Sequence, residues 1–368
     1  MNGTEQGAGP HAGMNDLVER LWDASSAGDE YAAADAALAA LDGGVDPEVF
    51  LLDVVAPVQA RVGVEWAANR ITVAQEHTAT AINERVIGAL AHHDAVRARR
   101  PADGAAARRA TVACIDGEWH AMPARILSEV LRLRGWHVDY LGAQVPTPHL
   151  IAHLHQTGPE VVALSSSIIT RLPTAHATIT ACQATGTPVL VGGAAYGGDG
   201  AYATLLGADA WASNGRAAAE RLSGGQLSAP VPVHETIDDL PHLTDQEYTY
   251  VARTAPELVR FTLDGLEERF PDMAGYTDQQ RRHTAEDIAF IVEFLGTALY
   301  LDEAEAFSGF LLWTAGILVA RGVPAHSLLP ALDLLDERLA DFPRSRAILT
   351  HAHEVLRKSE VPGDGPAA

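Results

Sequence analysis

Basic residues are scarce in this sequence. Lys and Arg number 26 against 48 Asp and Glu among 368 residues, so the formal net charge is −22. Surfaces that bind nucleic acid neutralise phosphates with clustered Lys and Arg, and we therefore expect no direct DNA binding. The one basic stretch, residues 97–109, is interrupted by Pro101 and Gly104 and is rich in alanine, which favours a solvated linker.

Cysteine and long apolar runs are scarce as well. The two cysteines, Cys114 and Cys182, are too few for a disulfide framework and fit no zinc-ligand spacing. No apolar run is long enough to span a membrane, and the N-terminus lacks the basic-then-apolar pattern of a signal peptide. We therefore expect a cytoplasmic protein without a membrane partner.

Helical periodicity dominates residues 14–98, after a Gly/Ala-rich start, residues 1–13, that we expect to be disordered. Asp46 followed by proline opens the third helix of this region, which should run to about residue 68. Thr72 and Gln75 form a capping box for a fourth helix, which should run to about residue 96. The pattern predicts an up-and-down four-helix bundle.

Residues 110–224 change to strands that alternate with helices. The five predicted strands are 111–115, 137–141, 161–165, 189–191 and 208–212, with helices starting near Met122, Pro148, Pro173 and Asp199. Crossovers of this length predict a five-stranded parallel sheet in a flavodoxin-like, or Rossmann-like, α/β domain. Residues 238–358 are helical again, and 359–368 form a frayed tail.

Ligands bind to such sheets at the carboxyl ends of the strands, where the strand order reverses. Three short segments follow strands there. The first is 116–123, which contains Glu118, Trp119, His120 and Met122; the others are Ser165-Ser166-Ser167 and Gly192-Gly193. An acid two residues before a histidine can orient its imidazole, as partners of metal-ligating histidines do. Small residues after the third and fourth strands leave a slot for a long, flat group.

This series resembles the cobalamin-binding domain of methionine synthase and its relatives, which carries Asp-x-His-x-x-Gly, then Ser-x-Leu, then Gly-Gly. The resemblance implies that His120 is the lower ligand to cobalt, that Glu118 tunes it, and that Ser165 or Ser167 holds the displaced nucleotide base. This chain has Glu118 for Asp, Pro123 for Gly and Ser167 for Leu. The alternative is that His120 caps a helix and the glycine pair is merely a turn.

The bundle carries a second constellation, in which Trp66 ends the third helix and Glu76-His77 open the fourth. This spacing resembles the helical cap of the light-sensing cobalamin repressors, where the Trp covers the upper face of the corrin and the Glu and His shape the adenosyl pocket. Those repressors have a His after the Trp, whereas this chain has Ala67. They also begin with a helix-turn-helix module that we do not find here. The alternative is a core aromatic and an acid favoured by the helix macrodipole.

The C-terminal helical region offers a candidate pocket rather than a motif. Its polar residues are Tyr276, Arg281, Arg282, His283 and Asp287, and its aromatic surface is expected from Tyr300, Phe307, Phe310 and Trp313. Paired Arg could hold propionates, and His283 and Asp287, four apart on a helix, share a face. The alternative, which the sequence favours equally, is that the polar residues are a solvent-exposed helix start and the aromatic residues belong to the core.

The order of the three regions resembles the photocobilins: helical cap, cobalamin domain, then a globin-like domain that binds a bilin. The resemblance implies biliverdin in the C-terminal domain. Since that region has no cysteine, the pigment would be bound noncovalently, or through a cysteine elsewhere in the chain. Haem on His283 is the rival.

We therefore predict a light sensor rather than an enzyme, an adenosylcobalamin-binding homo-oligomer (dimer or tetramer) that signals in trans, for example to an enzyme. The alternatives are a corrinoid methyl carrier of a methyltransferase system, a haem-based redox or gas sensor that also binds cobalamin, and a corrinoid storage protein.

Overall fold

The computed structural model describes residues 10–99, 108–228, 240–269, 273 and 275–359. The chain divides into two compact units. The first consists of residues 1–167 and 177–233, and the second of residues 168–176 and 234–368. The first unit holds both the helical bundle and the α/β domain, and the second unit is helical.

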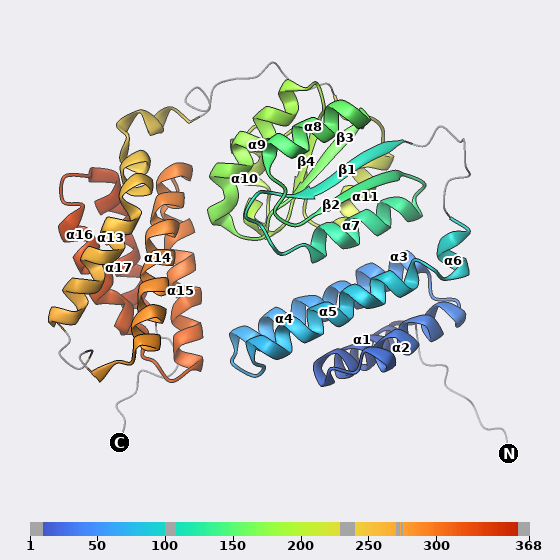
Figure 1. Cartoon of the computed structure of the whole chain (residues 1–368), viewed down its shortest axis with the longest axis horizontal. Coiled ribbons are helices and arrows are strands. Elements are labelled where there is room, and N and C mark those ends of the chain that lie inside the picture. Colours follow the sequence, from blue (N-terminus) through green and yellow to red (C-terminus); the bar gives the residue numbers. More distant parts are fainter. Residues whose placement is uncertain (1–9, 100–107, 229–239, 270–272, 274, 360–368) are drawn as a thin grey trace. The chain divides into compact units, whose positions relative to one another are not determined.

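The bundle is formed by helices near the start of the chain (Figure 1). They are α1 (Pro10–Ala27), α2 (Glu30–Asp42), α3 (Pro47–Phe50), the π-helical η1 (Leu51–Val55), α4 (Ala56–Ala67), α5 (Val73–Leu90) and the short α6 (Asp94–Arg97). The predicted capping box is confirmed, because Thr72 and Gln75 exchange side-chain-to-backbone hydrogen bonds at the start of α5. Fully buried side chains fill the core of the bundle, among them Leu21, Phe50, Val54, Val58, Val62 and Val86.

The predicted third and fourth helices differ in detail from the structure. The third is one continuous run of helix, but its middle turn, η1, is π-helical and comes just before Pro57. Proline has no amide proton to continue the regular hydrogen-bond ladder of an α-helix, and the π-helical turn lies directly before it. The fourth helix ends at Leu90 rather than near Val96.

The limits of the other predicted segments also shift. Helix α1 begins at Pro10, so residues 10–13 are helical rather than disordered. The expected linker, 97–109, and the expected tail, 359–368, lie largely outside the described residues.

The α/β domain has the predicted five-stranded parallel sheet. Its strands are β1 (Arg109–Cys114), β2 (His137–Gly142), β3 (Val161–Ser165), β4 (Val189–Gly192) and β5 (Ala210–Ala212), in the order β2-β1-β3-β4-β5. The last strand starts two residues later than predicted. This is the flavodoxin-like order, whose switch point lies between β1 and β3.

Helices cover both faces of the sheet (Figure 1). They are α7 (Met122–Leu133), α8 (Thr147–Thr157), α9 (Leu172–Ala184), α10 (Ala201–Leu205) and α11 (Gly215–Ser223), with the short η2 (Ile169–Arg171) and η3 (Ala194–Tyr196) between them. Helices α7 and α11 contact each other and lie on one face, and α8 and α9 lie on the other.

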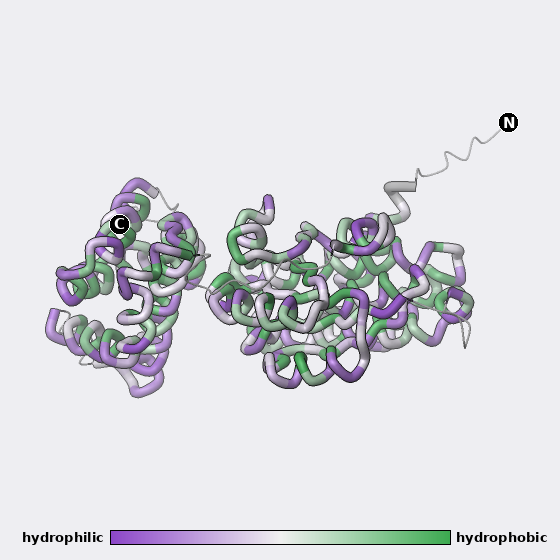
Figure 2. The backbone as a smooth tube through the Cα atoms, turned by 90° about the horizontal axis from the view of Figure 1, so that it is seen from above, coloured by the Kyte–Doolittle hydropathy of each residue, from purple (hydrophilic) through white to green (hydrophobic). Residues whose placement is uncertain are grey.

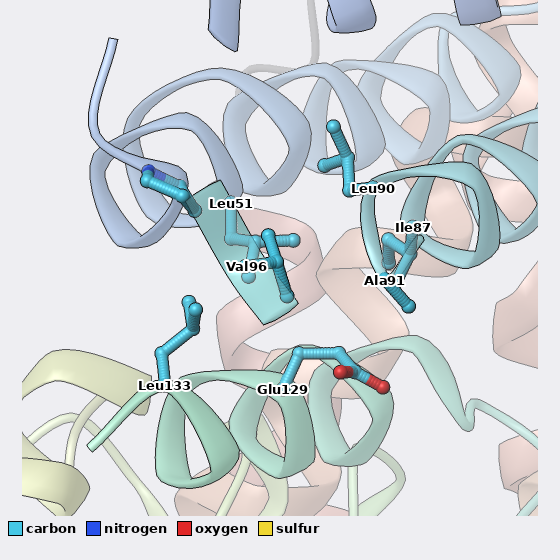
Figure 3. A pocket seen from close by; sticks show the side chains of 8 residues that line it. Leu51, Ile87, Leu90, Ala91, Val96, Glu129 and Leu133 are labelled. Atoms are coloured by element: carbon cyan, nitrogen blue, oxygen red, sulfur yellow. The ribbon is translucent and has the colours of Figure 1, made fainter. Parts of the chain in front are cut away.

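The bundle packs on α7. Apolar side chains of the bundle meet the second half of α7 around a small pocket, shown in Figure 3, which is lined by Pro47, Leu51, Ile87, Leu90, Ala91, Val96, Glu129 and Leu133. Two ion pairs flank this contact. Arg134 binds both carboxylate oxygens of Glu48, at 2.6 and 3.0 Å, and Arg216 binds Asp53 at 2.9 Å.

The described residues of the second unit form helices and no strand, as predicted; a globin-like arrangement stays a prediction. Its elements beyond η2 are η4 (Pro241–Asp245), α13 (Glu247–Arg269), α14 (Asp278–Leu301), α15 (Ala304–Ala320), η6 (Ala325–Leu328), α16 (Leu329–Arg338) and α17 (Pro343–Lys358). Hydrophobic and hydrophilic residues alternate along the helices of both units (Figure 2), which is typical of helices with one face in a core. Among the described residues, no helix is both long and apolar enough to cross a membrane.

The ion pair between Glu48 and Arg134 should fasten the bundle to α7. It is mostly buried, with 15% and 23% of the side chains exposed, so Glu48→Gln should lower the free energy of unfolding by about 1–3 kcal/mol. The matched control is Glu19→Gln, since Glu19 also binds an arginine with both oxygens but is 60% exposed; it should cost no more than about 1 kcal/mol. Urea unfolding measures both, and equal losses would contradict the assignment.

Candidate functional site

The loop that follows β1 emerges at the switch point of the sheet. Cys114, the last residue of β1, is paired with Ser165, the last residue of β3, and the amide of Ile115 donates to the carbonyl of Ser165 at 3.1 Å. The predicted segments after β1 and β3 therefore leave the sheet side by side. Pro123 occupies the first turn of α7, where a missing amide proton costs little. The helix therefore accommodates Pro123 in place of the glycine of the methionine synthase pattern.

Glu118 fixes the imidazole of His120. Its Oε1 lies 2.7 Å from His120 Nδ1 and also accepts the His120 backbone amide at 2.9 Å. Glu118 is fully buried, whereas 51% of the His120 side chain is exposed. When Nδ1 carries the proton that the carboxylate accepts, Nε2 is left as the lone-pair donor. That is the arrangement that orients metal-ligating histidines.

The second oxygen of Glu118 binds the segment after β3. Oε2 accepts the amide of Ser167 at 2.6 Å and the hydroxyl of Ser166 at 3.3 Å. A buried carboxylate is costly unless hydrogen bonds compensate it, and these donors supply that compensation. The His120 loop and the serine segment are thus joined through one side chain.

The glycine pair makes a close backbone crossing. At Gly193, where φ is +105°, an added Cβ would lie 2.1 Å from the carbonyl oxygen of Ser166. At Gly192, an added Cβ would lie 3.1 Å from the carbonyl oxygen of Ala212. Only glycine permits this approach and this φ together. The ends of β3, β4 and β5 are therefore held closely together beside the serine segment.

Tyr196 is the most unusual side chain beside this crossing. It is fully buried, follows Gly193 within η3, and its hydroxyl has no hydrogen-bond partner among the described residues. Burial raises the pKa of Tyr196, and the nearby charge of Glu118 raises it further. A buried hydroxyl without a partner is costly, so a polar group of a bound molecule would stabilise it.

The remaining predicted residues of this loop differ in burial. Trp119 is 67% exposed and meets the His120 ring edge-on at a centroid distance of 6.0 Å. Met122 is buried in the first turn of α7, and Ser165 is buried at the end of β3.

The bundle residues Trp66, Glu76 and His77 lie on either side of the α4–α5 turn. Trp66 is half-buried near the end of α4. His77 Nδ1 lies 2.6 Å from Glu76 Oε2, with 76% of the His77 side chain and 27% of the Glu76 side chain exposed.

The direction of α5 brings Glu76 toward the His120 loop. The second halves of α5 and α7 line the same pocket. Both helices end beside this pocket, and α5 has 18 residues whereas α7 has 12. The two helices run in the same direction in Figure 1, so the start of α5 extends beyond the start of α7, the helix that directly follows the His120 loop.

The second unit holds the other predicted residues. Helix α14 begins at Asp278, so Arg281, Arg282 and His283 lie in its opening turns, just after Tyr276. Arg281 pairs with Glu267 at 3.0 Å, and His283 pairs with Glu286 at 3.2 Å rather than with the exposed Asp287.

Two of the four predicted aromatic surface residues belong to the core. Phe307 is fully buried, and Tyr300 is 5% exposed with its hydroxyl 2.9 Å from His176 Nδ1. Phe310 stacks on Phe294, and only Trp313 is largely exposed. The helical period could not tell which face of an almost wholly apolar helix packs inward.

Sequence reasoning missed several residues of the site. Ser166 binds Glu118 and crosses Gly193, and the amide of Gln144, at φ +50°, donates to the Glu118 carbonyl at 2.9 Å. Tyr196 lies between the predicted glycine pair and the helix predicted to start near Asp199, and it was assigned no role. No local pattern marks these residues, because their contacts join segments 26 to 78 residues apart.

Comparison with known proteins agrees with this geometry. Residues 108–223 match the family described as B12 binding domain, and residues 17–91 match a second family with the same description. Both regions are B12-binding domains. They indicate cobalamin or a related corrinoid as the cofactor.

Two curated relatives from Myxococcus xanthus are similar to the chain. It is 34% identical to the HTH-type transcriptional repressor CarA over 152 residues, 40% of this chain and 47% of CarA. It is 32% identical to the HTH-type transcriptional repressor CarH over 202 residues, 52% of this chain and 62% of CarH. The chain spans about half the length of the curated relatives it matches.

Similar solved structures are corrinoid proteins of low identity. The monomethylamine corrinoid protein of Methanosarcina barkeri has a TM-score of 0.45 and 18% identity, over 56% of this chain and 97% of that chain. A cobalamin-binding protein of Desulfitobacterium hafniense has a TM-score of 0.32 and 19% identity, over 57% of this chain and 98% of that chain.

The prediction of no direct DNA binding is wrong by this comparison, because both curated relatives are HTH-type transcriptional repressors. It rested on net charge, which averages over the whole chain, whereas a protein binds phosphates through a local basic surface. The acidic balance of this sequence therefore does not exclude DNA as a partner.

The described residues fit a corrinoid. A half-exposed histidine held by a buried carboxylate suits an axial metal ligand, and the unpartnered hydroxyl of Tyr196 suits a polar group lying beside the Gly193 crossing. Among the described residues, no cluster of three or more His, Cys, Asp or Glu side chains could hold a bare metal ion. A corrin ring supplies its own four nitrogen ligands, so one histidine is enough.

The crossing at Gly193 can be tested by mutation. Gly193→Ala should weaken corrinoid binding and destabilise the domain, since its methyl group would collide with backbone. Gly186→Ala is the matched control, because its φ is +83° and nothing lies within 4 Å of the added Cβ; it should cost only about 1–2 kcal/mol. Thermal unfolding and corrinoid titration give both values, and similar losses in the two variants would contradict the close crossing.

Proposed function

We propose that this protein is a light sensor that holds adenosylcobalamin between its helical bundle and its α/β domain. The observation that carries the proposal is the buried Glu118 carboxylate, which fixes the half-exposed His120 at the switch point of the sheet. The B12-binding matches over both domains support the cofactor class, and the similarity to CarA and CarH supports a regulatory role.

The lower face of the corrin would be held by the α/β domain. His120 Nε2 is the proposed cobalt ligand, with Trp119 and Met122 beside it. Ser165, Ser167, Gly192 and Gly193 would hold the displaced nucleotide tail, since they surround the close crossing of β3 and β4.

The upper face would be covered by the bundle. Trp66, Glu76 and His77 are the proposed contacts with the adenosyl group, because the start of α5 extends past the start of α7. Bound adenosylcobalamin would supply a cobalt–carbon bond that absorbed light cleaves. Without the adenosyl group, Trp66, Glu76 and His77 would lose these contacts and the bundle would be free to shift on α7. The resulting conformational or assembly change is the signal, passed to a partner in trans, and no enzymatic activity is proposed.

The second unit is proposed to hold biliverdin noncovalently. Tyr276, Arg281, His283 and Asp287 are the proposed contacts at the start of α14, and the exposed Trp313 adds aromatic surface. Thioether attachment is disfavoured, because both cysteines are buried and burial raises the pKa of Cys114 and of Cys182 to about 12.

Illumination of the loaded protein tests the main proposal. Protein loaded with adenosylcobalamin should change its absorption spectrum irreversibly under green light and change its hydrodynamic size or protease sensitivity at the same time. His120→Ala should weaken corrinoid binding by at least about tenfold, whereas His137→Ala, a similarly exposed histidine of the same domain, should not.

The outcomes separate the alternative functions. A bound corrinoid whose illumination leaves size and protease sensitivity unchanged would contradict light sensing and favour storage or transport. Stable methylation by a methyl donor, with no preference for the adenosyl form, would favour a methyl carrier.

Titration with biliverdin tests the second chromophore. Arg281→Ala should weaken biliverdin binding about threefold, because an exposed ion pair between an arginine and a propionate contributes at most about 1 kcal/mol. Arg269→Ala is matched, since it is equally exposed and also pairs with a glutamate, and should leave binding unchanged. Denaturation should release the pigment; retention on the chain, or haem binding in its place, would contradict the proposal.

A further inference from the structure

A chain of hydrogen-bonded side chains runs through the bundle to Glu76. The Ser25 hydroxyl donates to Asn83 Oδ1 at 3.0 Å, and Asn83 Nδ2 donates to Gln59 Oε1 at 2.9 Å. Gln59 Nε2 donates to Thr80 Oγ1 at 2.8 Å, and the Thr80 hydroxyl donates to Glu76 Oε1 at 3.2 Å. The chain joins α1, α4 and α5, and it ends at the carboxylate that we place over the corrin.

All four donors in this chain point the same way. Each amide or hydroxyl donates a hydrogen toward Glu76, and each one after Ser25 also accepts a hydrogen from the residue behind it. The dipoles therefore add head to tail and end on a carboxylate. Hydrogen bonds in such chains polarise and strengthen one another, and the last one is charge-assisted. The arrangement favours one position of the Glu76 carboxylate.

The buried end of the chain is difficult to explain by folding alone. Asn83 is 0% exposed and Ser25 1%, within a core of Leu21, Val58 and Val86. Apolar residues of similar size would avoid the cost of burying these polar groups. Thr78, on the same helix, shows the ordinary alternative: its hydroxyl bonds to the Ala74 carbonyl one turn back.

We propose that Asn83, Gln59 and Thr80 are positioning residues that set the Glu76 carboxylate for the upper ligand of cobalt. The inference rests on the proposed adenosylcobalamin function. With Thr80 on Oε1 and His77 on Oε2, each oxygen keeps a lone pair that can accept a hydrogen from the ribose hydroxyls of an adenosyl group. A small upper ligand, such as water, has no ribose hydroxyls to donate to this carboxylate. The chain therefore favours the adenosyl form over forms with a small upper ligand.

The test compares affinities for adenosylcobalamin and hydroxocobalamin, measured in the dark on the full chain. Thr80→Val removes the donor to Glu76 with little change of shape, and it should weaken adenosylcobalamin binding about tenfold while hydroxocobalamin binding changes less than about twofold. Asn83→Leu breaks the hydrogen-bonded chain at a point distant from Glu76. It should lower the ratio of the adenosylcobalamin affinity to the hydroxocobalamin affinity, as Thr80→Val does. Thr80→Ser keeps the hydroxyl and should retain the wild-type ratio.

The control is Thr78→Val, the same substitution two residues away on α5, which should leave both affinities unchanged. Parallel loss of both affinities in Thr80→Val would mean a purely structural role and would overturn the inference. If Glu76→Gln lowers the ratio but Thr80→Val and Asn83→Leu do not, the inference fails and the adenosyl pocket stands. If Glu76→Gln leaves the ratio unchanged, the adenosyl pocket itself is wrong, and the inference falls with it.

Discussion

The structure of the site depends on one buried carboxylate. The side chain of Glu118 is fully buried and accepts hydrogen bonds from the His120 backbone and ring with one oxygen and from Ser166 and Ser167 with the other. Leaving such a group without its partners would cost several kcal/mol in a protein interior, so the loops after β1 and β3 have little freedom to separate. This constraint fixes the orientation of His120, and with it the face that a corrinoid ring would meet.

A second carboxylate, Glu76 in the bundle, is held by hydrogen-bonded side chains in the same way, on the proposed upper side of the corrinoid. Glu76 is held from behind by Thr80, Gln59 and Asn83. The end of α5 packs on α7 through apolar side chains, and the ion pair of Glu48, in α3, with Arg134 fastens the rest of the bundle to the end of α7. The two carboxylates differ in one respect: Glu118 is closed to solvent, whereas Glu76 is partly open. A fixed lower face and a partly open upper face suit a cofactor whose lower ligand stays and whose upper group can leave.

The fold could be predicted from the sequence where the signals are local. The capping box at Thr72, the five short apolar runs of the sheet and the Glu-x-His pattern all act within a few residues, and each lies where the sequence indicates. The π-turn before Pro57, the burial of Tyr300 and Phe307, and the chain from Ser25 to Glu76 could not be predicted in this way. They depend on which segments pack together, and periodicity does not carry that information. Net charge also failed as a guide to partners, since binding depends on local rather than total charge.

The ligation of cobalt by His120 is tested most directly by electron paramagnetic resonance of the cobalt(II) form in protein made with ¹⁵N-histidine. If His120 is the lower ligand, the superhyperfine pattern should change from a triplet to a doublet on labelling, and the doublet should disappear in His120→Ala. A triplet that survives labelling would show that the corrinoid keeps its own base on the metal, and it would contradict the account of the site given by Glu118 and His120.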